Sequence, residues 1–164
     1  MINLTKADIY RLLEAVTDPE IPVLTVQDLG VIRDVLIGEA GAVEVVITPT
    51  YSGCPAMDMI EVNIRATLQD AGISPVRVRT VLDPPWTTDW ISEEGKAKLR
   101  AYGIAPPVEE TPDKGRLFSN APEVPCPHCG ASDTRMLSPF GSTPCKAQYQ
   151  CRVCLEPFDY FKCH

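Results

Sequence analysis

The sequence predicts an α/β protein, in which a two-layer α-β-β-α-β core domain is followed by a small C-terminal zinc-ribbon module. Two observations predict this architecture. Residues 5–81 alternate between stretches with the hydrophobic spacing of amphipathic helices and stretches rich in β-branched residues. Residues 126–154 contain two Cys-x-x-Cys pairs, a spacing typical of structural zinc sites.

The first expected element is a helix that begins after Thr5, whose side chain can cap it, and ends before Pro19. One face of this helix is apolar with the i, i+3, i+4, i+7 spacing of a helix on a core. The residues of that face are Ile9, Leu12, Leu13 and Val16.

Three strands and a second helix complete the expected core. The β-rich stretches 31–37 and 42–50 are joined by Gly-Glu-Ala-Gly, which predicts a hairpin. The second helix should run from Pro55 to Gly72, and residues 75–81 alternate like a strand with one exposed face. Such a sheet must bury one face, and the two helices can cover it. The expected buried stripe of the second helix is Ile60, Ile64, Leu68 and Ala71.

Beyond the core, Trp86 and Trp90 are expected to cover the edge of the sheet, with contact to a partner as the alternative. A short helix capped by Ser92 follows. The next stretch is rich in proline and has no hydrophobic period, which predicts a linker. The expected domains are therefore 1–103 for the core, 104–122 for the linker and 123–164 for the zinc ribbon.

Charge and hydropathy exclude several classes of partner. The net charge is −7, whereas binding to nucleic acid needs massed lysine and arginine, so we expect no nucleic-acid partner. The sequence has no signal-peptide pattern and no apolar stretch long enough to span a membrane, so we expect a cytoplasmic protein with no membrane contact. In that reducing compartment, 7 cysteines are expected to be metal ligands or reactive thiols rather than disulfides.

The cysteine pairs of the tail can present four thiolates to one tetrahedral ion. A segment this small cannot build a sufficient core alone, so the metal should supply folding free energy. We expect structural Zn²⁺, with an iron–sulfur cluster on the same thiolates as the alternative. The expected ligands are Cys126, Cys129, Cys151 and Cys154. Packed thiols and surface imidazoles, or a secondary metal or redox role, are the alternatives for Cys145, Cys163, His128 and His164.

Cys54 is the one cysteine outside the tail, and it lies where the hairpin gives way to the second helix. The amides at a helix N-terminus favour a thiolate, although a small buried turn residue is the alternative. The loop 18–30 brings acidic residues, Asp18 and Glu20 among them, to the same sheet. Carboxylates beside a thiol suit transient metal binding better than nucleophilic catalysis, and both histidines lie in the tail. No nucleotide, flavin or di-iron motif is present, so we expect no catalytic residue.

The motifs "DPEIPVLTVQDLGVI" and "ITPTYSGCPAMDMI" resemble the MIP18-type proteins, which include bacterial SufT and are implicated in iron–sulfur assembly. The tail "SPFGSTPCKAQYQCRVCLEPFDYFKC", which follows "CPHCG", resembles the PaaD-type accessory proteins of bacterial phenylacetyl-CoA epoxygenase, also called phenylacetyl-CoA 1,2-epoxidase. Together the two resemblances cover nearly the whole chain.

The resemblance implies a maturation factor that acts in phenylacetate degradation and is not itself an enzyme. Its partners would be the oxygenase or reductase component of the epoxidase, into which it would help to insert iron or an iron–sulfur cluster. By position, Cys54 would be the functional thiol that binds iron or a cluster transiently, and Asp18 and Glu20 its acidic loop. An obligatory non-catalytic subunit and a zinc-ribbon protein-binding module are the alternatives, and a homodimer is left open.

Overall fold

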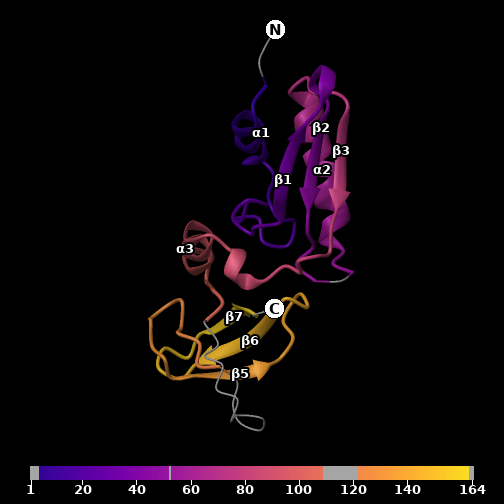
Figure 1. Ribbon diagram of the computed structural model, residues 1–164. Coiled ribbons are helices and arrows are strands. Elements are labelled where there is room, and N and C mark those ends of the chain that lie inside the picture. Colours follow the sequence, from indigo (N-terminus) through magenta and orange to yellow (C-terminus); the bar gives the residue numbers. More distant parts are fainter. Residues whose placement is uncertain (1–3, 52, 109–121, 163–164) are drawn as a thin grey trace. The chain divides into compact units, whose positions relative to one another are not determined.

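Figure 1 shows the computed structural model, which describes residues 4–51, 53–108 and 122–162. The chain divides into two compact units, one that ends at Gly95 and one that begins at Lys96. The first unit has the predicted α-β-β-α-β order, and the predicted ribbon strands follow in the second. No helix among these residues is long and apolar enough to cross a membrane.

Helix α1 spans Lys6–Leu13 and begins after Thr5, as predicted. The Thr5 hydroxyl accepts a hydrogen bond from the Asp8 amide, and the Asp8 carboxylate accepts one from the Thr5 amide at 3.0 Å. This reciprocal cap contributes about 1 kcal/mol to a helix end. The helix ends at Leu13, well before Pro19. Val16 is buried as expected, but it belongs to the loop that follows the helix.

The sheet of the first unit has the order β1-β2-β3. Strands β1 (Ile32–Ile37) and β2 (Val43–Ile47) form the predicted antiparallel hairpin, and β3 (Val76–Thr80) lies parallel to β2. Parallel neighbours need a crossover connection, and helix α2 (Ala56–Asp70) provides it.

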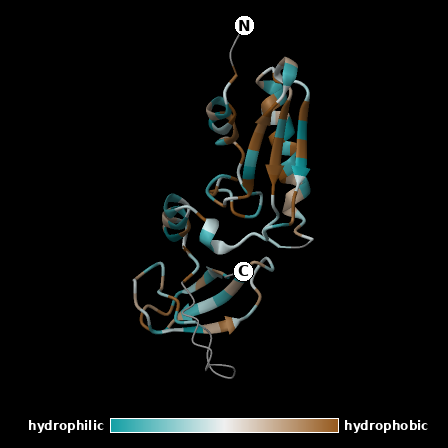
Figure 2. Ribbon diagram, viewed as in Figure 1, coloured by the Kyte–Doolittle hydropathy of each residue, from teal (hydrophilic) through white to brown (hydrophobic). Residues whose placement is uncertain are grey.

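The two helices cover one face of this sheet, because α1 contacts both β1 and α2, and α2 contacts β3. Hydrophobic residues run along much of β1 and β2 (Figure 2). The predicted stripe of α2 is confirmed except at Ala71, which is exposed because the helix has already ended there. The buried residues of α2 are Ala56, Ile60, Ile64 and Leu68.

The segment after β3 packs on the first unit through its tryptophans. Trp86 is buried, and its Nε1 donates to the Leu29 carbonyl at 2.7 Å. Trp90 lies against Gly30, and the Arg33 guanidinium carbon is 3.7 Å from the centroid of its ring. Trp90 thus contacts the side chain of a residue on edge strand β1, whereas Trp86 bonds to the loop before that strand. Helix α3 (Glu93–Tyr102) then begins after Ser92, whose hydroxyl accepts from the Gly95 amide at 2.9 Å.

The second unit contains a sheet of order β4-β7-β6-β5. Strands β5 (Thr134–Ser138), β6 (Lys146–Cys151) and β7 (Pro157–Phe161) agree with the predicted ribbon. Strand β4 (Ile104–Ala105) lies in the predicted linker, and this part of the prediction is wrong because Ile104 and Ala105 pair with β7. A strand of two residues is too short to show an alternating hydrophobic pattern, so it could not be predicted from the sequence. Residues 109–121 of the predicted linker lie outside the described residues.

Candidate metal centre

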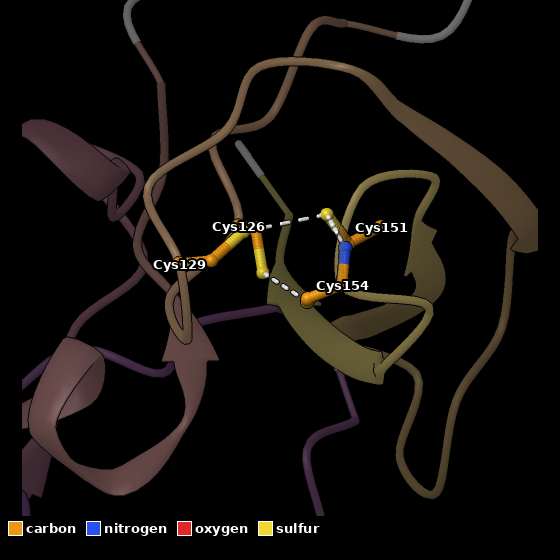
Figure 3. A group of neighbouring side chains, drawn as sticks. All are labelled: Cys126, Cys129, Cys151 and Cys154. Atoms are coloured by element: carbon orange, nitrogen blue, oxygen red, sulfur yellow. Dashed lines mark hydrogen bonds between the residues drawn. The ribbon is translucent and has the colours of Figure 1, made fainter.

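The four cysteines predicted to bind metal come from two turns of the second unit. Cys126 and Cys129 lie in the loop before β5, while Cys151 ends β6 and Cys154 lies in the turn before β7. Their side chains converge on one point from these two segments (Figure 3). All four sulfur atoms lie within 4.8 Å of one another.

The sulfur positions fit a tetrahedral ion of the size of zinc. Cys126 Sγ is 3.8 Å from Cys154 Sγ, and Cys129 Sγ is 3.6 Å from Cys151 Sγ. A zinc–sulfur distance of about 2.3 Å places neighbouring sulfurs of a tetrahedron about 3.8 Å apart. The residues present therefore fit a structural metal ion with a closed set of thiolate ligands.

Backbone amides support the sulfurs of both turns. The His128 amide donates to Cys126 Sγ at 3.4 Å, and the Val153 amide donates to Cys151 Sγ at the same distance. Each turn then needs a residue with positive φ directly after its second cysteine: Gly130 with φ 76° and Leu155 with φ 66°. The two turns thus have the same backbone design, although glycine stands in one and leucine in the other.

The amides also set which thiol ionises first. Hydrogen bonds from the backbone amides of Cys154 and Val153 lower the pKa of Cys151 to about 7, although burial opposes this. At Cys154, the Glu156 amide lowers the pKa, but burial and the neighbouring thiols outweigh it and raise the pKa to about 12. For Cys129, the Ala131 amide lowers the pKa, but partial loss of solvation and the thiols of Cys151 and Cys126 outweigh it and raise the pKa. A cation is therefore needed before all four sulfurs can carry charge together.

The metal centre joins a small hydrophobic core. Cys126 and Cys151 are buried in one cluster with aromatic residues of β6 and β7. Tyr149 stacks on Phe158 and meets Tyr160 edge-on, with ring centroids 5.9 and 5.4 Å apart. Cys129, by contrast, is exposed, so one side of the site faces solvent.

The secondary cysteine and histidine candidates do not join this group in the described part of the chain. Cys145 is buried, with its sulfur 3.0 Å from the Thr143 hydroxyl. The ring of His128 lies near Gly103 and away from the ligand set. Cys163 and His164 lie outside the described residues.

Cys54 lies directly before Pro55, the residue that caps α2, as its place in the sequence predicts. It is half-buried, and its carbonyl accepts from the Met57 amide at 3.2 Å. Within the described residues, its thiol has no hydrogen-bond partner. Gly53 before it has φ 79°, which lets the chain turn sharply from the sheet into the helix.

The acidic loop has a structural role that its sequence did not reveal. Asp18 is buried, and its Oδ1 accepts from the amides of Glu20 at 2.7 Å and Ile21 at 2.8 Å. Asp28 ties the same loop to the start of α3, since its backbone carbonyl accepts from the Ser92 amide at 2.8 Å. Cys54, Asp18 and Glu20 do not form a group of three close metal ligands, and in the part of the chain that the structure describes only the tail cysteines do.

Two protein-family models match the chain. A model described as iron-sulfur cluster assembly protein matches residues 6–84, and one described as PaaD zinc beta ribbon domain matches residues 110–162. The two matches follow each other along the chain without overlap.

Curated proteins show the same two parts. An Escherichia coli (strain K12) protein assigned as a subunit of 1,2-phenylacetyl-CoA epoxidase is 48% identical over 95% of this chain and 92% of its own length. The Fe-S protein maturation auxiliary factor of Porphyromonas gingivalis is 41% identical, and the alignment covers 58% of this chain and 90% of that protein. The auxiliary factor YitW of Bacillus subtilis is 35% identical over 57% of this chain and 92% of its own length.

Solved structures resemble a part of the chain of about the same length as the shorter relatives match. A domain of unknown function, DUF59, from Bacillus anthracis has a TM-score of 0.54 at 29% identity and covers 57% of this chain and 90% of its own. A conserved hypothetical protein from Thermotoga maritima has a TM-score of 0.51 at 33% identity, with coverage of 58% and 94%.

Proposed function

The chain belongs to the family of the Escherichia coli protein assigned to phenylacetyl-CoA epoxidase, and we propose that it is a maturation factor of the 1,2-epoxidase system of phenylacetate degradation. In this proposal it helps to insert iron or an iron–sulfur cluster into the reductase or oxygenase component and does not itself catalyse epoxidation. One observation carries the proposal: a single chain joins an iron–sulfur assembly domain to a PaaD-type zinc ribbon.

Cys54 is the thiol that we assign to the cargo. It lies at the start of α2, it is accessible, and its sulfur has no partner among the described residues. Asp18 holds the backbone at Glu20, so its proposed part is to position that loop as well as to add negative charge. Since no group of three ligands forms here among the described residues, the cargo would complete its coordination with groups of the client, as suits a transient site.

The ribbon is the part to which we assign docking. Its four cysteines are proposed to hold Zn²⁺, which would fold the ribbon without taking part in transfer. Four thiols this close together remain reduced most readily in a reducing compartment, which supports a cytoplasmic location.

The test compares the client components made with and without this chain. Oxygenase and reductase are purified from a strain that lacks it, and from strains that carry the wild type or Cys54→Ala, and their iron and acid-labile sulfide are measured. We expect one component to lose iron or cluster both without the chain and with Cys54→Ala. Full metal content in both components from the deletion strain would refute the proposal. Zinc content and circular dichroism of the Cys54→Ala protein show that the variant has folded.

The assignment of the Escherichia coli relative to the epoxidase itself favours one alternative, a non-catalytic subunit that is needed during turnover. Metal-loaded oxygenase and reductase distinguish it from a maturation factor. A maturation factor can be removed after loading without loss of epoxidation, whereas removal of a turnover subunit stops the reaction.

A further inference from the structure

A groove of about 590 Å³ lies beside the metal centre within the second unit. Pro106, Pro107 and Val108 line it from the segment after β4, and Pro125 and Pro127 from the two sides of Cys126. Arg100, in the last turn of α3, lies at the same groove. We call this feature the proline groove.

The walls of the proline groove suit an apolar occupant. Proline has no amide hydrogen, so four of the lining residues offer no backbone donor to a ligand. Their rings and Val108 are partly exposed carbon surface, and the rings lose little conformational freedom when they are covered. Hydrogen-bond donors in the groove therefore come only from the lining residues that are not proline.

Arg100 is the one charged residue that lines the groove in the described part of the chain. It is exposed, and among the described residues its guanidinium makes no ion pair or hydrogen bond. The chain as a whole has 22 acidic against 15 basic side chains, so an arginine with no acidic partner in the described part of the chain is notable. The C-terminal end of α3 stabilises a cation at this position, but it leaves the donors of the guanidinium available to a carboxylate.

We propose that the proline groove binds an extended segment of an epoxidase component, with an apolar side chain between the prolines and a carboxylate against Arg100. This inference rests on the proposed function, which supplies the epoxidase component as partner. Cys126 lines the groove as well as the metal centre, so docking also depends on the bound metal.

The experiment measures the affinity of the full-length, metal-loaded chain for the purified oxygenase and reductase components. The test variants are Arg100→Glu and Val108→Asp, and Arg100→Lys keeps the charge. The control is Arg135→Glu, which reverses the charge of an exposed arginine of β5 that lines a different cavity and also removes its hydrogen bonds to Gln150. Equal metal content in all variants shows that the ribbon has folded. A photo-crosslinking residue at position 108 identifies the occupant by mass spectrometry.

We expect Arg100→Glu and Val108→Asp each to weaken binding about 10-fold or more, and the control to remain within about 2-fold. Chelation of the metal should abolish docking, and the crosslink should map to a segment of the component that contains Asp or Glu. If the groove variants bind as tightly as the wild type, the groove is not the docking site, although the proposed maturation role is unaffected. A crosslink to a second copy of this chain would overturn the groove as well. If the wild type binds neither component, both the groove and the proposed function fail.

Discussion

The Sγ atoms of Cys129 and Cys151 lie 3.6 Å apart, although 22 positions separate the two residues in the sequence. The β5–β6 hairpin closes this distance, since Thr134 pairs with Cys151 across it. The same Thr134 donates its hydroxyl to the Val124 carbonyl at 2.8 Å and so holds the segment that leads to the first cysteine pair. The hairpin and the metal centre therefore depend on each other for their geometry.

Loss of one ligand should unfold the ribbon and leave the first unit folded. Binding of structural zinc contributes about 10–16 kcal/mol to small metal-folded domains, so Cys151→Ser should lower metal affinity at least about 100-fold. Metal analysis after dialysis against a chelator measures the effect. Cys54→Ser is the control and should keep its full zinc content. A Cys151→Ser chain that retains one tightly bound metal would contradict a four-thiolate site.

Metal binding should release protons at neutral pH. Cys154, with a pKa of about 12, and Cys129, whose pKa is also raised, are protonated in the metal-free protein, while Cys151 with a pKa of about 7 is half ionised. Thiolates bind the metal, so the pKa values of the ligands fall on binding, and the stability that the metal adds is lost as the pH decreases. Calorimetry in two buffers of different ionisation enthalpy should give more than about two protons per metal at pH 7. A release of fewer than two would mean that the thiols ionise before the metal arrives.

Leu155→Gly should stabilise the ribbon. Leu155 has φ 66° and is 67% exposed, so it carries backbone strain and loses little packing when its side chain is removed. Replacing such a residue by glycine removes the strain of the left-handed backbone angles and raises the free energy of unfolding by about 1 kcal/mol. Chelator competition or denaturant unfolding of the zinc-loaded chain measures the change.

The matched position of the other turn provides the reverse experiment. Gly130 has φ 76°, and a Cβ added there would meet nothing within 4 Å, so Gly130→Ala introduces the strain without a clash. It should destabilise the ribbon by about 1 kcal/mol. Equal stability of both variants and the wild type would show that the φ values at these turns carry no cost.

Features with a local signal could be predicted from the sequence. The cap at Thr5, the stripe of α2 and the two cysteine pairs each show as a spacing pattern in the sequence, and the structure has them all except the last position of the stripe, Ala71. Features made by tertiary contacts could not be predicted. Strand β4 exists through two residues that pair with β7, and the positive φ of Leu155 follows from the metal turn and not from its residue type.

In the acidic loop, residue type alone predicts only part of what a side chain does. The sequence places Asp18 near a thiol and predicts a charge for metal handling, and that prediction remains open. Its buried carboxylate also accepts two backbone amides, a role that depends on the path of the loop. Substitutions can separate the two roles because asparagine keeps one acceptor oxygen and removes the charge.

Asp18→Ala should destabilise the first unit by about 2 kcal/mol, since it leaves the amides of Glu20 and Ile21 without their acceptor. Asp18→Asn can accept from both amides through its Oδ1, so its free energy of unfolding should stay within about 1 kcal/mol of the wild type. If the charge of Asp18 helps to handle the cargo, the asparagine variant will fold and yet leave the client component low in iron. Denaturant unfolding and client iron content, measured on the same variant, decide between the roles. Full client iron with Asp18→Asn would restrict Asp18 to holding the loop, and would leave Glu20 as the acidic residue proposed to act with Cys54.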